Sequence, residues 1–125
     1  MPTAASAASS PDAGATLAKA VVRAARALGL RNADVARIVG TSEASVSRMS
    51  RGRPVDPQSK EGELALLFLR LFRSLDAIVG GSEVQASAWL HSHNTHVGGV
   101  PAERIHSVQG LLDVVRYLDA MRGRV

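Results

Sequence analysis

The sequence predicts an all-α fold in which an N-terminal helix-turn-helix bundle is followed by a small helical domain. Apolar residues recur at helical spacing in successive segments of the 125-residue chain. Glycine, proline and capping residues separate these segments, and none of them shows the alternation of a β-strand. We therefore expect a disordered arm at residues 1–15, a helix-turn-helix bundle at 16–56 and a second helical domain at 57–125.

The first segments are a polar arm and an amphipathic helix. The arm is rich in alanine, serine and proline and carries one charge, so it is expected to be a passive tail. The helix runs from Thr16 to Leu28 and ends at Gly29. Its cationic residues lie off the apolar stripe, where they could contact a phosphate backbone or simply be solvated. These residues are Lys19, Arg23 and Arg26.

The stretch from Asn32 to Gly52 predicts two short helices joined at Gly40. Asn32 is a suitable N-cap, and Gly40 suits the left-handed end of the first helix. Thr41 and Ser42 can cap the second helix. The two apolar stripes contain Val35, Ala36, Ile38, Val39, Val46 and Met49. The remaining side chains of the second helix are small, hydroxylated or arginine, which suits the major groove of double-stranded DNA.

Charge supports a polyanionic partner for this half of the chain. Residues 1–53 contain eight basic and three acidic residues, whereas residues 54–125 contain seven basic and eight acidic residues. The basic excess therefore belongs to the half with the paired helices, as neutralisation of phosphates would require.

Composition excludes several other classes of protein. The chain has no cysteine, which rules out disulfides and thiolate metal sites and favours the cytoplasm. Aromatic residues make up only 3% of the chain, too few for a platform that stacks single-stranded nucleic acid. No apolar run approaches the roughly 20 residues of a membrane helix. There is no phosphate-binding loop and no clustered acid–base pair, so we expect no enzyme, no catalytic residues and no cofactor.

Asp56 and Pro57 predict the start of the longest helix, which would end near Val79. The middle of this helix is apolar on nearly every side, so in a short chain it needs extra covering surface. We favour a homodimer interface here, and burial between the two halves is the alternative.

The segments after Gly80 and Gly81 predict three further helical pieces. Ser82 caps the first, whose buried candidates are Val84, Ala88 and Trp89. Pro101 opens the second, through His106, after the turn at residues 97–101. Ser107 caps the last, with Leu111, Leu112, Val115, Leu118 and Met121 as its buried stripe. A cluster formed by His91, His93 and His96 matches no strong zinc pattern, so we interpret these as loop histidines and expect no metal site.

The paired helices resemble the helix-turn-helix of Xre and phage repressors. Ala36 stands where the family has a small residue, and Gly40 stands at the turn. Val46 and Met49 occupy the positions that pack back on the first helix. The resemblance implies that Arg48 contacts a guanine and that Thr41, Ser42 and Arg51 contact phosphates. The residues implied to face DNA are Thr41, Ser42, Glu43, Ala44, Ser47, Arg48 and Arg51.

The second half resembles the C-terminal toxin-binding domain of the Xre/MbcA/ParS antitoxins. The matching features, in order, are Trp89-Leu90, Asn94, Gly98-Gly-Val-Pro101, Ile105, Gly110 and the ending at residues 114–123. The histidine cluster and the segment after Pro101 depart from the family pattern. The two resemblances together cover the chain from about Thr16 to its C-terminus.

This resemblance implies an antitoxin that blocks the active site of a RES-domain, NAD-consuming toxin and represses its own operon on operator DNA. The arginine-bearing end of the last helix could enter the pocket of the toxin, or its arginines could merely complement the helix dipole. A stand-alone dimeric repressor is the alternative function. The residues expected to bind the toxin are Arg116, Asp119, Met121, Arg122, Gly123, Arg124 and Val125.

Overall fold

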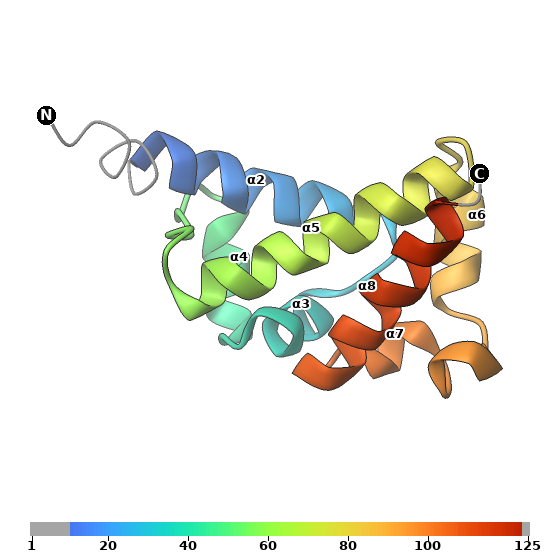
Figure 1. The fold of residues 1–125 in the computed structure, drawn as a ribbon. Helices are drawn as coiled ribbons and strands as arrows, with labels where there is room; N and C mark the ends of the chain where they lie inside the picture. Colours follow the sequence, from blue (N-terminus) through green and yellow to red (C-terminus); the bar gives the residue numbers. More distant parts are fainter. Residues whose placement is uncertain (1–10, 124–125) are drawn as a thin grey trace, which may run out of the picture.

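The computed structural model describes residues 11–123, which form seven α-helices and one short 3-10 helix (Figure 1). A single bridge between Asn94 and Gly99 is the one extended pairing in this range, so the predicted all-α class is confirmed. No helix within residues 11–123 is long and apolar enough to cross a membrane. The elements are α2 (Pro11–Ala27), α3 (Asn32–Val39), α4 (Glu43–Met49), α5 (Lys60–Ile78), α6 (Glu83–Leu90), η1 (Thr95–Val97), α7 (Pro101–Arg104) and α8 (Val108–Arg122).

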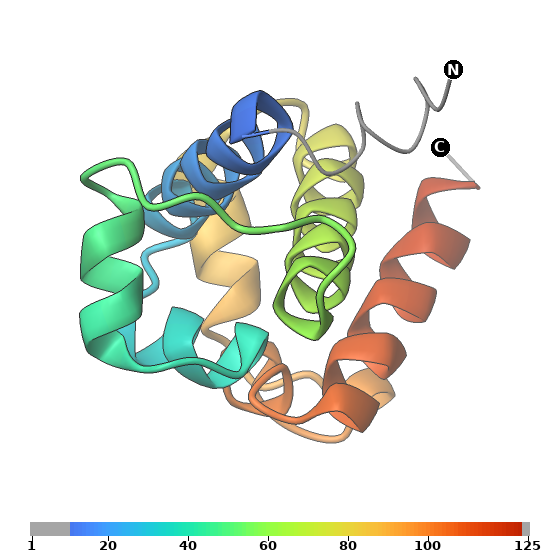
Figure 2. The ribbon, with the colours of Figure 1, turned by 90° about the vertical axis from the view of Figure 1, so that its left-hand side faces the viewer.

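Helix α5 is the centre of the fold. It packs on α2 and α3 on one side and on α8 on the other, as Figure 2 shows. Its side chains Phe68, Leu71 and Leu75 are completely buried. The helix is apolar on most of its circumference, as the sequence indicates, and neighbouring helices accordingly cover it from several directions. Leu66 is the exception, since 45% of its surface remains exposed.

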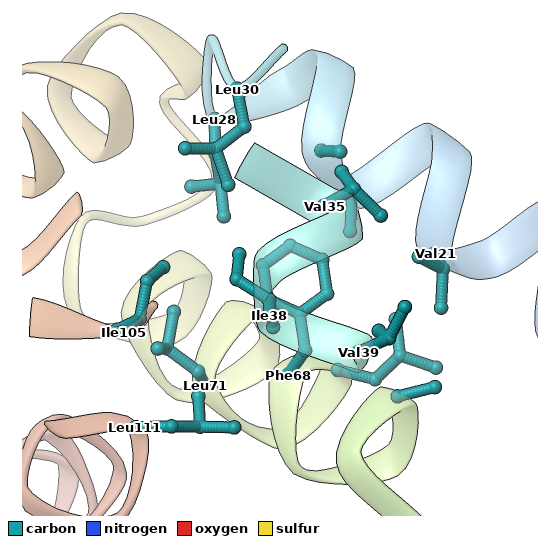
Figure 3. Packing of buried hydrophobic residues seen from close by; sticks show 14 of the residues in the cluster. Val21, Leu28, Leu30, Val35, Ile38, Val39, Phe68, Leu71, Ile105 and Leu111 are labelled. Atoms are coloured by element: carbon teal, nitrogen blue, oxygen red, sulfur yellow. The ribbon is translucent and has the colours of Figure 1, made fainter. Parts of the chain in front are cut away.

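The buried side chains of both halves form one hydrophobic cluster. Figure 3 shows the region where Ile38 of α3, Phe68 and Leu71 of α5, Ile105 at the end of α7 and Leu111 of α8 meet. The cluster therefore joins the helix-turn-helix to the C-terminal helices. The predicted division of the chain at residues 56 and 57 stays a prediction, because α5 contributes to the packing of both halves.

Helix α2 begins earlier than the sequence suggests. It starts at Pro11, so the expected arm is wrong for residues 11–15, and residues 1–10 lie outside the described range. The amide of Val55 donates to the carbonyl of Gly14 at 3.1 Å, which ties the first turn to the loop before α5. Asp12 in this turn also interacts favourably with the positive end of the helix dipole. The buried stripe predicted for Thr16–Leu28 is confirmed.

Helix α5 begins later than the sequence suggests. Asp56 and Pro57 form a turn instead, because the Asp56 carboxylate accepts a hydrogen bond from the amide of Gln58 at 2.9 Å. Ser59 is the N-cap, and its hydroxyl accepts from the amide of Gly62 at 3.0 Å. Gly62 permits this arrangement, since a β-carbon there would overlap the Asp56 carbonyl.

Several predicted burial positions in the C-terminal half are wrong. In α6, Val84 is 81% exposed, Ala88 is exposed and Trp89 is half-buried, whereas Ala86 and Leu90 are buried. This eight-residue helix has apolar residues on every side, so its sequence does not determine which side faces the core. In α8, Leu111, Val115 and Leu118 are buried as expected, Val114 is buried as well, and Leu112 and Met121 are half-buried.

Gly110 provides a test of the packing between α7 and α8. A β-carbon at Gly110 would overlap the carbonyl oxygen of Arg104, which is backbone and cannot rotate away. We expect Gly110→Ala to lower the free energy of unfolding by about 1 to 3 kcal/mol, measured by urea denaturation.

Gly123→Ala is the matched control. Gly123 has a helical φ of −65°, and its added β-carbon would meet no atom nearer than 3.5 Å. The control should leave stability unchanged or raise it by up to about 1 kcal/mol. Equal losses from the two substitutions would contradict the packing described for Gly110.

Candidate functional site

Helices α3 and α4 form a helix-turn-helix, with the turn located at Gly40 as predicted. Gly40 has a left-handed φ of 76°, and its amide donates to the carbonyl of Ala36 at 3.0 Å. Ser42 then caps α4, because its hydroxyl accepts from the amide of Ser45 at 3.1 Å. Val46 and Met49 are buried, which confirms the predicted packing side of α4.

The outer side of α4 lies at the edge of the molecule, as Figure 2 shows. None of the side chains predicted to face DNA is buried. Thr41 and Ser47 are partly exposed, and the other predicted DNA-facing residues are exposed: Ser42, Glu43, Ala44, Arg48 and Arg51.

Two serines hold the arginines of α4. The guanidinium of Arg48 donates to the hydroxyl of Ser45 at 3.0 Å, and that of Arg51 donates to the hydroxyl of Ser47 at 2.9 Å. Ser45 is only 8% exposed, and the hydroxyl of Ser42 also donates to it at 3.1 Å. These bonds restrict the rotamers of the arginines before any partner binds, which lowers the entropy cost of binding. Sequence analysis missed the role of Ser45, although its spacing of three residues from Arg48 is a usable signal.

A basic groove continues from the end of α4 onto α2. The exposed residues Lys19, Arg23 and Arg26 line a surface pocket of about 370 Å³ together with Met49 and Ser50. The three cations give this groove a positive charge, which Glu83 at its edge offsets in part.

The start of α3 is tied to the C-terminal half. The predicted N-cap is wrong by one residue: Arg31 is the cap, and its amide donates to the Asp34 carboxylate at 2.9 Å. The other oxygen of Asp34 lies 3.0 Å from Nε2 of His106. Partial burial acts to raise the pKa of Asp34, but the hydrogen bonds and charges of Arg31 and His106 outweigh it and lower that pKa.

A second polar contact joins the same two parts of the chain. Nε2 of His91 lies 2.9 Å from the carbonyl of Leu28, at the end of α2. The other histidines of the cluster do not converge with it, since His96 stacks on Tyr117. Within residues 11–123 no three potential ligand side chains gather at a metal site. Sequence analysis missed both histidine contacts to the first half.

The end of α8 is fixed on α5 by Asp119. One oxygen of this carboxylate lies 2.7 Å from the guanidinium of Arg70, and the other accepts from the hydroxyl of Ser74 at 2.8 Å. Arg122 lies 3.5 Å from the same hydroxyl. Both oxygens of the Asp119 carboxylate are therefore bound by residues of α5, and these contacts orient the last turn of α8.

The other residues predicted to bind a toxin differ in exposure. Arg116, Arg122 and Gly123 are exposed and Met121 is half-buried, whereas Arg124 and Val125 lie outside the described residues.

Comparison with known families divides the chain at the middle of α5. Residues 7–70, more than half of the chain, match the model of the antitoxin Xre-like helix-turn-helix domain. Residues 74–124 match the model of the antitoxin Xre/MbcA/ParS C-terminal toxin-binding domain. A search of curated proteins found no match. The α3–α4 pair lies within the first match, and η1, α7 and α8 lie within the second.

The Asp34 carboxylate predicts how stability depends on pH. Folding lowers the pKa of the Asp34 carboxyl, so its ionised form adds to the free energy of unfolding above about pH 3.8, the ordinary value of that pKa. This contribution is lost as the pH falls through the pKa of the folded state. We expect Asp34→Asn to lower the free energy of unfolding by about 1 to 2 kcal/mol at pH 7. Urea denaturation should show this difference shrink as the pH is lowered below about 3.8.

Glu103→Gln is the control, because Glu103 is an exposed carboxylate on α7, close to His106 in sequence. It should change stability little at either pH. A loss in Asp34→Asn that persists undiminished at pH 2 would contradict the role given to the charge of Asp34.

Proposed function

This chain belongs to the antitoxins that combine an Xre-like helix-turn-helix with an Xre/MbcA/ParS toxin-binding domain, and we propose that it neutralises a RES-domain toxin and represses its own operon. One observation carries this proposal. The helix-turn-helix lies near the start of α5 and the last turn of α8 lies near the end of α5, so the two surfaces are at opposite ends of the molecule (Figure 1). Toxin and operator can therefore be bound by one chain at the same time.

The DNA-binding role follows from the outer side of α4. In a major groove, Arg48 would donate two parallel hydrogen bonds to one guanine, and Arg51, Thr41 and Ser42 would contact phosphates. The basic groove of α2 would then neutralise further phosphates on the flank. Because α4 has only seven residues, it can read a short half-site.

A homodimer would supply the second half-site. Between α2 and α5 lies an open apolar groove of about 530 Å³, and the exposed Leu66 borders it. Asp12 and Arg73 line the same groove. Across a two-fold axis every contact occurs twice, so Asp12 of each copy could pair with Arg73 of the other. The cytoplasmic form would then be a dimer, or a larger assembly with toxin.

Blocking the toxin requires no chemistry from the antitoxin. RES-domain toxins consume NAD, whose pyrophosphate needs a pocket suited to anions. Arginines at the end of α8 suit such a pocket because the guanidinium is planar, always charged and bidentate. Asp119, held by Arg70 and Ser74, would position this end for insertion. The exposed Arg122 and the following Arg124 are the residues that would enter.

Arg48→Ala tests the DNA-binding surface. It should weaken binding to the duplex from the chain's own promoter by about 1 to 3 kcal/mol, because a bidentate base contact is lost. Fluorescence anisotropy at fixed salt would measure this loss on the promoter duplex and on a random duplex of equal length.

Arg116→Ala is the charge-matched control, since Arg116 is exposed on α8 and the variant loses the same charge. Its binding to the promoter duplex should change less than about 2-fold. An equal loss for Arg48→Ala on both duplexes would mean that Arg48 contacts only the backbone.

Deleting Arg122 to Val125 tests the antitoxin role of the C-terminal end. Co-expression of the full chain with the product of the neighbouring reading frame should restore growth, whereas the shortened chain should fail because the pocket stays open. The shortened chain should still bind the promoter duplex, which serves as the control for folding.

The outcome also separates the two functions under consideration. A neighbouring product that is harmless alone, or one that the full chain does not counteract, would favour the stand-alone repressor. Full rescue by the shortened chain would instead contradict insertion of the tip.

A further inference from the structure

Three aromatic rings stack on the surface of the C-terminal half. The ring centroids of Trp89 and Tyr117 are 6.2 Å apart with planes inclined by 10°. Those of His96 and Tyr117 are 5.5 Å apart with planes inclined by 14°. The rings come from α6, η1 and α8, so three separate elements converge on Tyr117. We call these three rings the aromatic stack.

The stack is not part of the buried core. Trp89 and Tyr117 are half-buried against the core, and His96 is exposed. Within residues 11–123 neither the indole N–H of Trp89 nor the hydroxyl of Tyr117 has a hydrogen-bond partner, and neither atom is buried. Buried tryptophan and tyrosine usually satisfy these groups, whereas interface residues keep them for a partner.

The composition of this surface matches that of a protein-binding site. Tryptophan, tyrosine and arginine are the residues most enriched among those that dominate binding energy. The stack supplies the first two, and the exposed Arg116 directly precedes Tyr117. Trp89 and His96 both stack on Tyr117, and this packing restricts their rotamers and lowers the conformational entropy lost when a partner covers them.

Position and charge select the toxin as the occupant. All three rings lie within residues 74–124, which match the toxin-binding domain. Tyr117 precedes Arg122 by five residues on α8, about 8 Å along the helix and about 140° around it, so the stack and the tip are separate surfaces of one helix. DNA is a poor candidate because residues 54–125 carry more acidic than basic groups.

We propose that the aromatic stack of Trp89, His96 and Tyr117 is the anchor that binds the toxin, separate from the tip that blocks its pocket. The proposal rests on the antitoxin function given above. In this proposal the rings provide most of the affinity for the toxin, and the arginines at the end of α8 inhibit it.

The test measures binding of the toxin encoded by the neighbouring reading frame by biolayer interferometry. We expect Tyr117→Ala to weaken binding by at least about 30-fold and His96→Ala by about 3- to 10-fold. His96→Ala is included because it removes an exposed ring without opening the core. Val108→Ala is the control, since Val108 is 56% exposed and nine residues earlier on α8, on the opposite side of the helix. It should bind within about 2-fold of the unaltered chain.

The chain shortened by deletion of Arg122 to Val125 separates anchor from tip. It should still bind the toxin, and Tyr117→Ala in the shortened chain should abolish that binding. If the shortened chain loses all binding and His96→Ala binds like the unaltered chain, the anchor proposal is overturned and the antitoxin function stands.

Other occupants would also be revealed. If Tyr117→Ala and His96→Ala dissociate the homodimer in light scattering, a second copy covers the stack and the proposal is wrong. A loss of promoter binding by His96→Ala would likewise assign the stack to DNA. If the unaltered chain does not bind the neighbouring product, the antitoxin function itself fails.

Discussion

Burial of α5 between the two halves is the constraint on which the rest of the structure depends. Phe68, Leu71 and Leu75 have no exposed surface, and neither half of the chain alone could cover them on every side. Burial of apolar side chains such as these is the dominant favourable term in the free energy of folding. As a result, the helix-turn-helix and the C-terminal helices share one core, although family comparison treats them as two domains.

Local signals made the helix-turn-helix predictable. Gly40, Ser42 and the buried pair Val46 and Met49 are determined by capping chemistry and helical period within a few residues. The start of α5 was mispredicted because two capping signals, at Asp56 and Ser59, lie close together. Packing of Gly62 against the turn, a contact formed only after folding, favours the second signal.

Long-range polar contacts could not be predicted in the same way. Asp34 and His106 are separated by 72 residues, and His91 and Leu28 by 63. Nothing in the local sequence of either partner identifies the other, because their proximity depends on how both halves pack on α5. The burial pattern of α6 failed for a related reason, since only its neighbours decide which of its apolar sides is covered. The arginines of α4 lie between these cases. Their exposure was predictable, and the short spacings of Ser45 and Ser47 from them are usable signals, but the hydrogen bonds themselves were seen only in the structure.

The shared core also explains why α5 restricts how the protein can change. Each side of α5 has a different role. Phe68 faces the common core, and Leu66 borders the groove proposed for dimerisation. Arg70 and Ser74 bind Asp119 at the end of α8. A substitution on a buried side therefore weakens both halves at once, because cavity formation destabilises the single core. A substitution on an exposed side can alter one partner while leaving the others intact. We accordingly expect substitutions that change the bound partner to occur on the outer surfaces of α4, α6 and α8, where the side chains do not pack on α5.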